Sequence, residues 1–171
     1  MCSQDYHPEM FSRQTIPVFA AIGCALAAGL SAAAVSAQTA ETPYWASISV
    51  DKVHMRRGPS TNYPIEWVYQ RRGVPVKVLR TNEGWRYVED PDGTRGWMAA
   101  RMLSRTRFAI VIGEDTAAIR AEGGPSAHLR WHVEPGVIGE LGECAGGWCE
   151  FSVRGHSGFV EAERLWGDGA P

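Results

Sequence analysis

The sequence predicts an all-β protein of two small barrels in tandem, preceded by an N-terminal export segment. Three observations lead to this prediction. The 171 residues include 19 Gly, 10 Pro and 7 Trp, and frequent turn residues with many aromatics favour short strands over long helices. Glycines and tryptophans recur at matched intervals, which indicates an internal repeat. An uncharged apolar run lies within the first 37 residues.

The composition excludes several protein classes before any motif is considered. Charged residues make up 21% of the chain and hydrophobic residues 44%, which is typical of a globular protein. A net charge of −2 argues against a dedicated nucleic-acid binder, because such proteins usually carry a positive excess. Beyond residue 40 no apolar stretch approaches membrane-spanning length. A multi-pass membrane protein, a collagen-like fibre and a coiled coil are therefore excluded.

The first 37 residues have the layout of a secretory signal peptide. Arg13 precedes an uncharged apolar run over residues 16–37, and the run ends in the small residues Val35-Ser36-Ala37. Met10 is an alternative start that would give a leader of ordinary length. The competing interpretation is an uncleaved membrane anchor, because about 20 apolar residues can span a bilayer.

Cysteine usage agrees with export. Cys24 faintly resembles a lipoprotein cleavage site, but the apolar run continues past it, where a lipoprotein would become polar. Cleavage after Ala37 removes Cys2 and Cys24 and leaves 134 of the 171 residues. The mature chain would then hold only Cys144 and Cys149, an even number of cysteines.

The rest of the chain divides into two copies of one unit. The matching pairs of intervals are Gly73–Trp85 and Gly136–Trp148, Trp85–Gly96 and Trp148–Gly158, and Gly96–Leu103 and Gly158–Leu165. Their agreement in one order indicates duplication. We therefore expect a linker at 38–43, barrel 1 at 44–104, barrel 2 at 105–166 and a tail at 167–171. The openings of the units also match, 55–60 against 119–126, with extra residues in the second.

Short strands and tight turns make up each unit. Residues 74–78 and 86–88 alternate between apolar and other side chains, as half-buried strands do. Glu83-Gly84 and Gly146-Gly147 read as two-residue hairpin turns, and residues 90–93 as another turn. Pro75 lacks an amide hydrogen, so we expect it at an edge or at a strand start. About 60 residues with five or so short strands close most naturally as a small, strongly bent barrel.

The motifs of the first unit resemble the bacterial SH3-type (Src-homology-3-like) domain. They are Met55-Arg56-Arg57-Gly58-Pro59-Ser60, Gly73-Val74-Pro75-Val76, Gly84-Trp85 and Gly96-Trp97-Met98. The second unit is similar, with Phe159 where Trp is usual. The resemblance implies two tandem SH3-like β-barrels and a location in the cell envelope. Bacterial members of this class are often modules that bind cell wall or peptides, and the resemblance assigns no activity to the tandem form.

Candidates for catalysis and metal binding are weak, so we expect no enzyme, no cofactor and no metal. A cysteine peptidase would need a thiolate next to a histidine, yet no Cys stands at a helix start, where its pKa would fall. A structural zinc site would need a second ligand pair beside the cysteines, and the single later histidine, His156, does not supply one. Two pairs of acids, Asp90 with Asp92 and Glu161 with Glu163, lack an opposing carboxyl group across a cleft.

The two mature cysteines are predicted to form a disulfide. If Gly146-Gly147 is the turn, Ala145 and Trp148 form the first cross-strand pair, and Cys144 and Cys149 form the next. Cα atoms in such a non-hydrogen-bonded pair lie about 4.5 Å apart, within reach of a disulfide. The matching positions of the first unit, Thr81 and Arg86, cannot form one.

Aromatic and basic residues of the first unit give the candidate binding site. Tyr63 and Trp67 lie around the loop after Gly58-Pro59, and Trp85 directly follows a turn. If Val88 points inward, Trp85 points at least partly outward. An exposed aromatic surface suits an extended peptide, and a basic side chain would meet its carboxylate. The candidate ligand-binding residues are Arg57, Tyr63, Trp67, Trp85 and Arg86.

Charge is divided unevenly between the units. Residues 44–104 carry ten Lys and Arg against six Asp and Glu, a net charge of +4, whereas residues 105–171 carry six Arg against ten acids, a net charge of −4. One interpretation is that the first unit faces an anionic partner. The other is that opposite charges help the units dock, or that the division is drift.

The sequence favours a non-catalytic binding module of the bacterial cell envelope. Its expected ligand is a cell-wall peptide or an extended segment of an envelope protein, with the first barrel as reader and the second as support. A structural or adaptor protein that bridges envelope proteins is the alternative, and a cell-wall hydrolase is a third. The expected location is periplasmic or extracellular. Contact with nucleic acid is not expected, and contact with the membrane is expected only through an uncleaved N-terminal segment.

Overall fold

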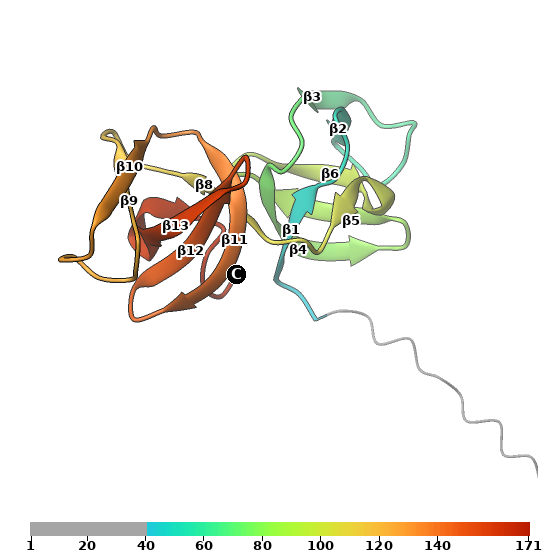
Figure 1. The fold of residues 1–171 in the computed structure, drawn as a ribbon. Coiled ribbons are helices and arrows are strands. Elements are labelled where there is room, and N and C mark those ends of the chain that lie inside the picture. Colours follow the sequence, from blue (N-terminus) through green and yellow to red (C-terminus); the bar gives the residue numbers. More distant parts are fainter. Residues whose placement is uncertain (1–40) are drawn as a thin grey trace, which may run out of the picture. The chain divides into compact units, whose positions relative to one another are not determined.

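A computed structural model describes residues 41–171 and shows two small antiparallel β-barrels in tandem (Figure 1). This confirms the predicted fold class. The predicted signal peptide at 1–37, with Cys2, Met10 and Cys24, and residues 38–40 of the predicted linker lie outside the described residues.

The first barrel holds seven strands and one short 3₁₀ helix. Its elements are β1 (Tyr44–Ile48), β2 (Val53–Arg56), β3 (Ile65–Tyr69), β4 (Pro75–Asn82), β5 (Trp85–Glu89), β6 (Arg95–Ala99), η1 (Ala100–Met102) and β7 (Leu103–Ser104). The second barrel repeats them as β8 (Phe108–Val111), β9 (Ala117–Arg120), β10 (Leu129–Val133), β11 (Ile138–Ala145), β12 (Trp148–Val153), β13 (His156–Glu161), η2 (Ala162–Arg164) and β14 (Leu165–Trp166). Among residues 41–171, no helix is long and apolar enough to cross a membrane.

Both sheets have the same strand order, so residues of the two barrels can be matched one to one. The orders are β3-β2-β6-β5-β4-β1-β7 and β10-β9-β13-β12-β11-β8-β14. Arg56 pairs with Trp97 as Arg120 pairs with Phe159, and Thr81 pairs with Arg86 as Cys144 pairs with Cys149. This agreement in register confirms the duplication at the level of backbone pairing.

The turns lie where the sequence places them. Glu83 and Gly84 join β4 to β5, and Gly146 and Gly147 join β11 to β12. Glu83, Gly146 and Gly147 have positive φ angles of 46°, 59° and 83°, which such two-residue hairpin turns need. Pro75 begins β4, so its missing amide hydrogen interrupts no strand interior.

The opening loops correct one expectation from the sequence. We expected extra residues in the second opening, because its Gly-Pro-Ser lies further from the preceding arginine. In the structure the amides of Arg57 and Ala121 donate to the carbonyls of Pro64 and His128, so the two loops have equal length. The Gly-Pro-Ser of the second loop is shifted within it, and Ala127 occupies the place of Tyr63.

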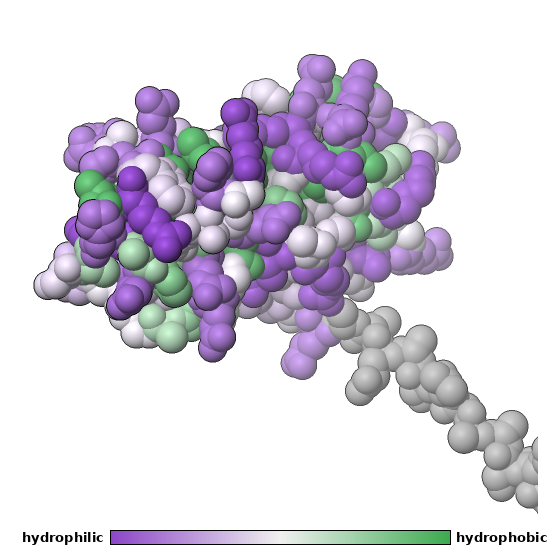
Figure 2. Space-filling view, viewed as in Figure 1, coloured by the Kyte–Doolittle hydropathy of each residue, from purple (hydrophilic) through white to green (hydrophobic). Residues whose placement is uncertain are grey.

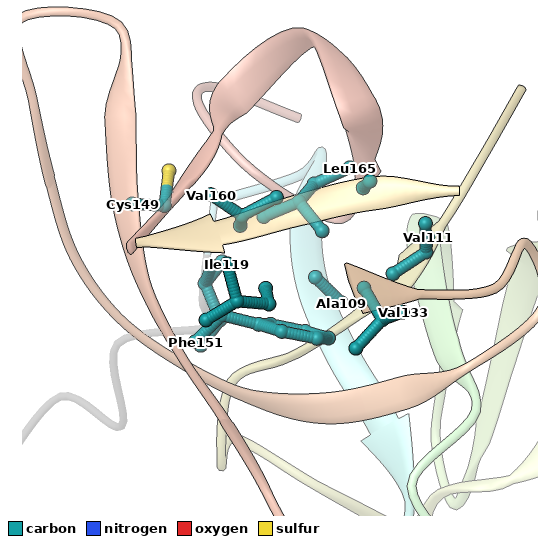
Figure 3. Packing of buried hydrophobic residues seen from close by; sticks show 10 residues of the cluster. Ala109, Val111, Ile119, Val133, Cys149, Phe151, Val160 and Leu165 are labelled. Carbon is teal, nitrogen blue, oxygen red and sulfur yellow. The ribbon is translucent and has the colours of Figure 1, made fainter. Parts of the chain in front are cut away.

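Each barrel has its own apolar core. Ile48, Met55, Val76, Val88 and Met98 lie in the first core, each almost fully buried. In the second core the ring of Phe151 extends toward Ala109 and Val133 beneath Ile119 (Figure 3). The face of the molecule shown in Figure 2 is mostly hydrophilic, with apolar side chains scattered over it.

The predicted disulfide between Cys144 and Cys149 is confirmed. The two residues pair across β11 and β12, and their Cα atoms lie 4.0 Å apart. At the matching pair of the first barrel, the guanidinium of Arg86 donates to the Tyr44 hydroxyl (2.9 Å) and to the carbonyls of Glu83 (2.9 Å) and Trp85 (2.8 Å). An arginine clasp therefore holds the strand end that the disulfide holds in the second barrel.

The two barrels belong to one compact unit of the chain. The rings of Trp45 and Trp166 meet edge to face, with centroids 4.7 Å apart. The hydroxyl of Ser47 donates to the carbonyl of Thr106 (2.6 Å), and Arg71 Nη1 donates to the carbonyl of Gly136 (3.0 Å). These contacts join residues of barrel 1 to the connecting segment and to barrel 2.

Candidate functional site

A groove beside Trp85 is the candidate site of the first barrel. Trp85 begins β5 directly after the hairpin turn and pairs with Ala99 at the end of β6. The amide of Ala100 donates to the carbonyl of Gly84 (2.8 Å), which fixes the turn against η1. The groove has a volume of ≈ 260 Å³, and its lining residues are Lys52, Val53, His54, Arg56, Thr61, Trp85, Ala99, Arg101 and Met102.

The charge of this Trp85 groove is uniformly positive. Lys52, Arg56 and Arg101 line it, together with His54, and no Asp or Glu is among its lining residues. Arg56 Nη1 donates to the carbonyls of Thr61 (2.9 Å) and Tyr63 (2.6 Å). One arginine therefore shapes the opening loop and contributes charge to the groove, and the arrangement suits an anionic ligand beside an aromatic ring.

Of the five residues predicted for the site, only Trp85 lines the groove. Arg57 forms an ion pair with Glu66 (3.0 Å), and Arg86 forms the clasp described above. Tyr63 is 47% exposed, and its ring lies against Gly58. Trp67 is 57% exposed and lies on β3, not in the loop where the sequence places it.

The other groove residues were missed because they meet through pairing between distant strands. His54 and Arg56 alternate with the buried Val53 and Met55 on β2, so their outward direction could have been inferred. The pairing of β2 with β6 could not. Arg101 had a signal in the repeat, because the closing segment of the second unit carries Glu163 at the same place.

The second barrel has an equivalent groove of opposite charge. Its lining residues are Pro125, Gly146, Gly147, Trp148, Glu161, Ala162 and Glu163, and its volume is ≈ 490 Å³. The amide of Ala162 donates to the carbonyl of Gly147 (2.9 Å), as Ala100 does to Gly84 in the first barrel. Glu161 and Glu163 take the places of Ala99 and Arg101, so the Trp148 groove is acidic.

The chemistry available in residues 41–171 is limited. Cys144 and Cys149 are joined, so neither presents a thiolate. Within the described range, no three His, Cys, Asp or Glu side chains are grouped to hold a metal ion. Burial, together with a hydrogen bond to Asp90, raises the pKa of the Tyr69 hydroxyl far above its ordinary value. That hydroxyl donates to Asp90 Oδ2 (2.6 Å), which is a structural contact inside the barrel.

The chain belongs to the bacterial SH3 domain family. The family described as "Bacterial SH3 domain" matches it twice, at residues 49–105 and 113–167, which together exceed half of its length. This confirms the resemblance seen in the motifs. No curated protein matches the sequence closely enough to count as a relative.

Three solved structures are similar in part. NlpC2 from Trichomonas vaginalis has 15% identity and a TM-score of 0.34, with 73% of this chain and 48% of that chain covered. For NlpC1 from the same organism the values are 16%, 0.33, 77% and 50%. For an NlpC/P60 family protein from Bacillus cereus they are 13%, 0.32, 72% and 56%. The chain thus spans about half the length of these proteins, and TM-scores of this size support no conclusion about function.

Proposed function

We propose that this protein is a non-catalytic binding module of the bacterial cell envelope. Its ligand would be an anionic cell-wall peptide or an extended, acidic segment of an envelope protein. The observation that carries the proposal is the Trp85 groove, which three basic side chains and one tryptophan line without any acid. Membership of the bacterial SH3 family supports a binding role over a catalytic one.

Export of the protein belongs to the same proposal. A disulfide between Cys144 and Cys149 persists in an oxidising compartment and is rare in a reducing cytosol. The apolar run at 16–37 followed by small residues has the pattern of an export signal. We propose a periplasmic or extracellular location on these two grounds.

The structure changes which residues we propose to bind the ligand. Trp85 keeps its role, and Arg56 and Arg101 replace Arg57 and Arg86 as the basic partners, because only the former line the groove. Tyr63 and Trp67 are exposed and would contact only a ligand that extends beyond the groove.

Co-sedimentation with purified cell walls tests the proposal. The protein should bind, and Trp85→Ala should weaken binding about thirty-fold, because loss of a central aromatic typically costs about 2 kcal/mol. Arg101→Glu, which installs the residue of the second barrel, should weaken binding at low salt and less at high salt. The matched control is Trp148→Ala, which should retain binding.

Each other outcome has a distinct meaning. If Trp148→Ala abolishes binding and Trp85→Ala does not, the groove of the first barrel is not the reader. If cell walls do not bind the protein but an envelope protein is captured and identified, Trp85→Ala distinguishes the two roles. Loss of capture supports a ligand segment in the Trp85 groove, whereas unchanged capture means that the adaptor role replaces this proposal. Release of soluble wall fragments would show hydrolysis and would contradict a non-catalytic role.

A further inference from the structure

A hollow in the second barrel lies outside both grooves. It is bounded by β10 and the turn after it, by the start of β11 and by the turn between β12 and β13. Arg71 of the first barrel also lines it. Its volume is ≈ 680 Å³, which exceeds the ≈ 260 Å³ and ≈ 490 Å³ of the grooves and lies in the range of pockets for small ligands.

At this hollow the second barrel lacks a polar bridge that the first barrel has. In the first barrel the Tyr69 hydroxyl reaches Asp90 Oδ2 (2.6 Å) and so connects the end of β3 to the turn after β5. Val133 and Val153 stand at the matching positions and line the hollow. Two short apolar side chains do not span the distance that a tyrosine and an aspartate span.

The lining combines an apolar floor with charged groups at its edge. Val133 is buried and Val153 half-buried, and the rings of Trp131 and His156 meet edge to face with centroids 6.2 Å apart. This surface suits an apolar side chain.

Two guanidinium groups border this floor. Arg71 and Arg154 face one acid, Glu134, among the lining residues. The ion pairs within residues 41–171 are Arg57–Glu66 and Arg95–Glu89, so neither guanidinium is neutralised by a described acid. Arg71 is fixed by its bond to the Gly136 carbonyl (3.0 Å), and it bounds the hollow on the side of the first barrel.

We propose that this hollow binds the C-terminal end of a peptide. The apolar last side chain would lie on Val133, Val153 and Trp131, and the terminal carboxylate would meet Arg71 and Arg154. Two arginines against one glutamate leave one positive charge to complement a single carboxylate. Arg71 bounds the hollow on the side of the first barrel, and its guanidinium there suits the terminal carboxylate of a peptide that ends in the hollow. The site goes beyond the proposed function, because it shares no residue with either groove.

The test is a titration of the full chain, disulfide intact, with acetyl-Ala-Ala-Leu bearing a free carboxylate. NMR would follow the indole N–H of Trp131, identified by its loss in Trp131→Phe. We expect that signal to shift on titration and the carboxamide of the same peptide to bind at least tenfold more weakly. An internal-glutamate peptide, acetyl-Ala-Glu-Leu-Ala-amide, should also bind at least tenfold more weakly.

Matched variants separate the site from general charge effects. Arg71→Gln should weaken binding at least fivefold, and the adjacent Arg72→Gln should leave it unchanged. The double variant Val133→Tyr/Val153→Asp, which rebuilds the bridge of the first barrel, should abolish binding while the circular dichroism spectrum is retained. Absence of binding, equal binding of the carboxamide or the internal-glutamate peptide, or binding that survives the double variant would each overturn the proposal.

Discussion

The two barrels fill matching positions of their cores with side chains of different size. In the first, Val76 on β4 and Val88 on β5 share the core, both fully buried. In the second, Gly139 and Phe151 stand at these positions, and a Cβ on Gly139 would lie 2.6 Å from the ring of Phe151. One large and one absent side chain therefore replace two of medium size. The comparison shows that the strand register is the same in both barrels, although the side-chain volume is distributed differently between the two neighbouring strands.

Electrostatics diverge more than packing does. The turn, the 3₁₀ helix and the tryptophan of each groove are retained, and Arg101 is replaced by Glu163. The buried hydrogen bond between Tyr69 and Asp90 is replaced by two valines. The charge of a surface groove in a duplicated domain can thus change sign while the backbone pairing is kept.

Truncation of the central core residue should have the largest effect. Phe151→Ala should lower the free energy of unfolding by about 4 kcal/mol, because it leaves a cavity next to Gly139. Val88→Ala, its counterpart, should cost about 2 kcal/mol. Urea denaturation, with amide exchange to assign the loss to one barrel, measures both. Equal losses would show that the second core collapses around the cavity.

Loss of the Cys144–Cys149 disulfide and loss of the Arg86 clasp should differ less in their effect on stability than the two core truncations do. Reduction of the disulfide should cost about 2 kcal/mol, since the loop that it closes is short. Arg86→Ala should cost about 1 kcal/mol, because it removes hydrogen bonds at a partly exposed position. Urea midpoints with and without reductant give the first value, and the variant gives the second. A larger loss for Arg86→Ala would make the arginine clasp the stronger device.

Loss of the Tyr69–Asp90 bridge should cost an amount between those of the two hairpin devices at neutral pH, and it should change how stability depends on pH. Tyr69→Phe should cost about 1.5 kcal/mol at pH 7. Burial first, and Asp90 second, raise the pKa of Tyr69 in the folded state, so its stabilisation is complete below the unfolded pKa of about 10 and falls as the pH rises above it. Urea midpoints from pH 8 to 11 should fall more steeply for the wild type than for Tyr69→Phe. Parallel profiles would contradict this role.

The repeat and its turns were predictable because they depend on local sequence. Glu83 in the first hairpin turn, and Gly146 and Gly147 in the second, have positive φ. Each turn then dictates which residues pair, which is why the Cys144–Cys149 disulfide followed from spacing alone. The groove was only partly predictable. Trp85 follows its turn directly, whereas His54, Arg56 and Arg101 join it through pairing of β2 with β6. The error in the second opening loop came from treating Gly-Pro-Ser as a fixed point, although the shared hydrogen bonds are made by the backbone around it.

The exchange of volume between Gly139 and Phe151 also bears on how a duplicated chain avoids misfolding. Tandem domains with matching registers are prone to exchange strands with each other during folding. If β4 took the place of β11, Val76 would occupy the position of Gly139 and its side chain would collide with the ring of Phe151, which a Cβ alone would approach to 2.6 Å. If β11 took the place of β4, Gly139 would leave a void beside Val88. Each strand is thereby matched to the partner in its own hairpin, and the exchange of volume disfavours pairing of β4 with β12 or of β11 with β5.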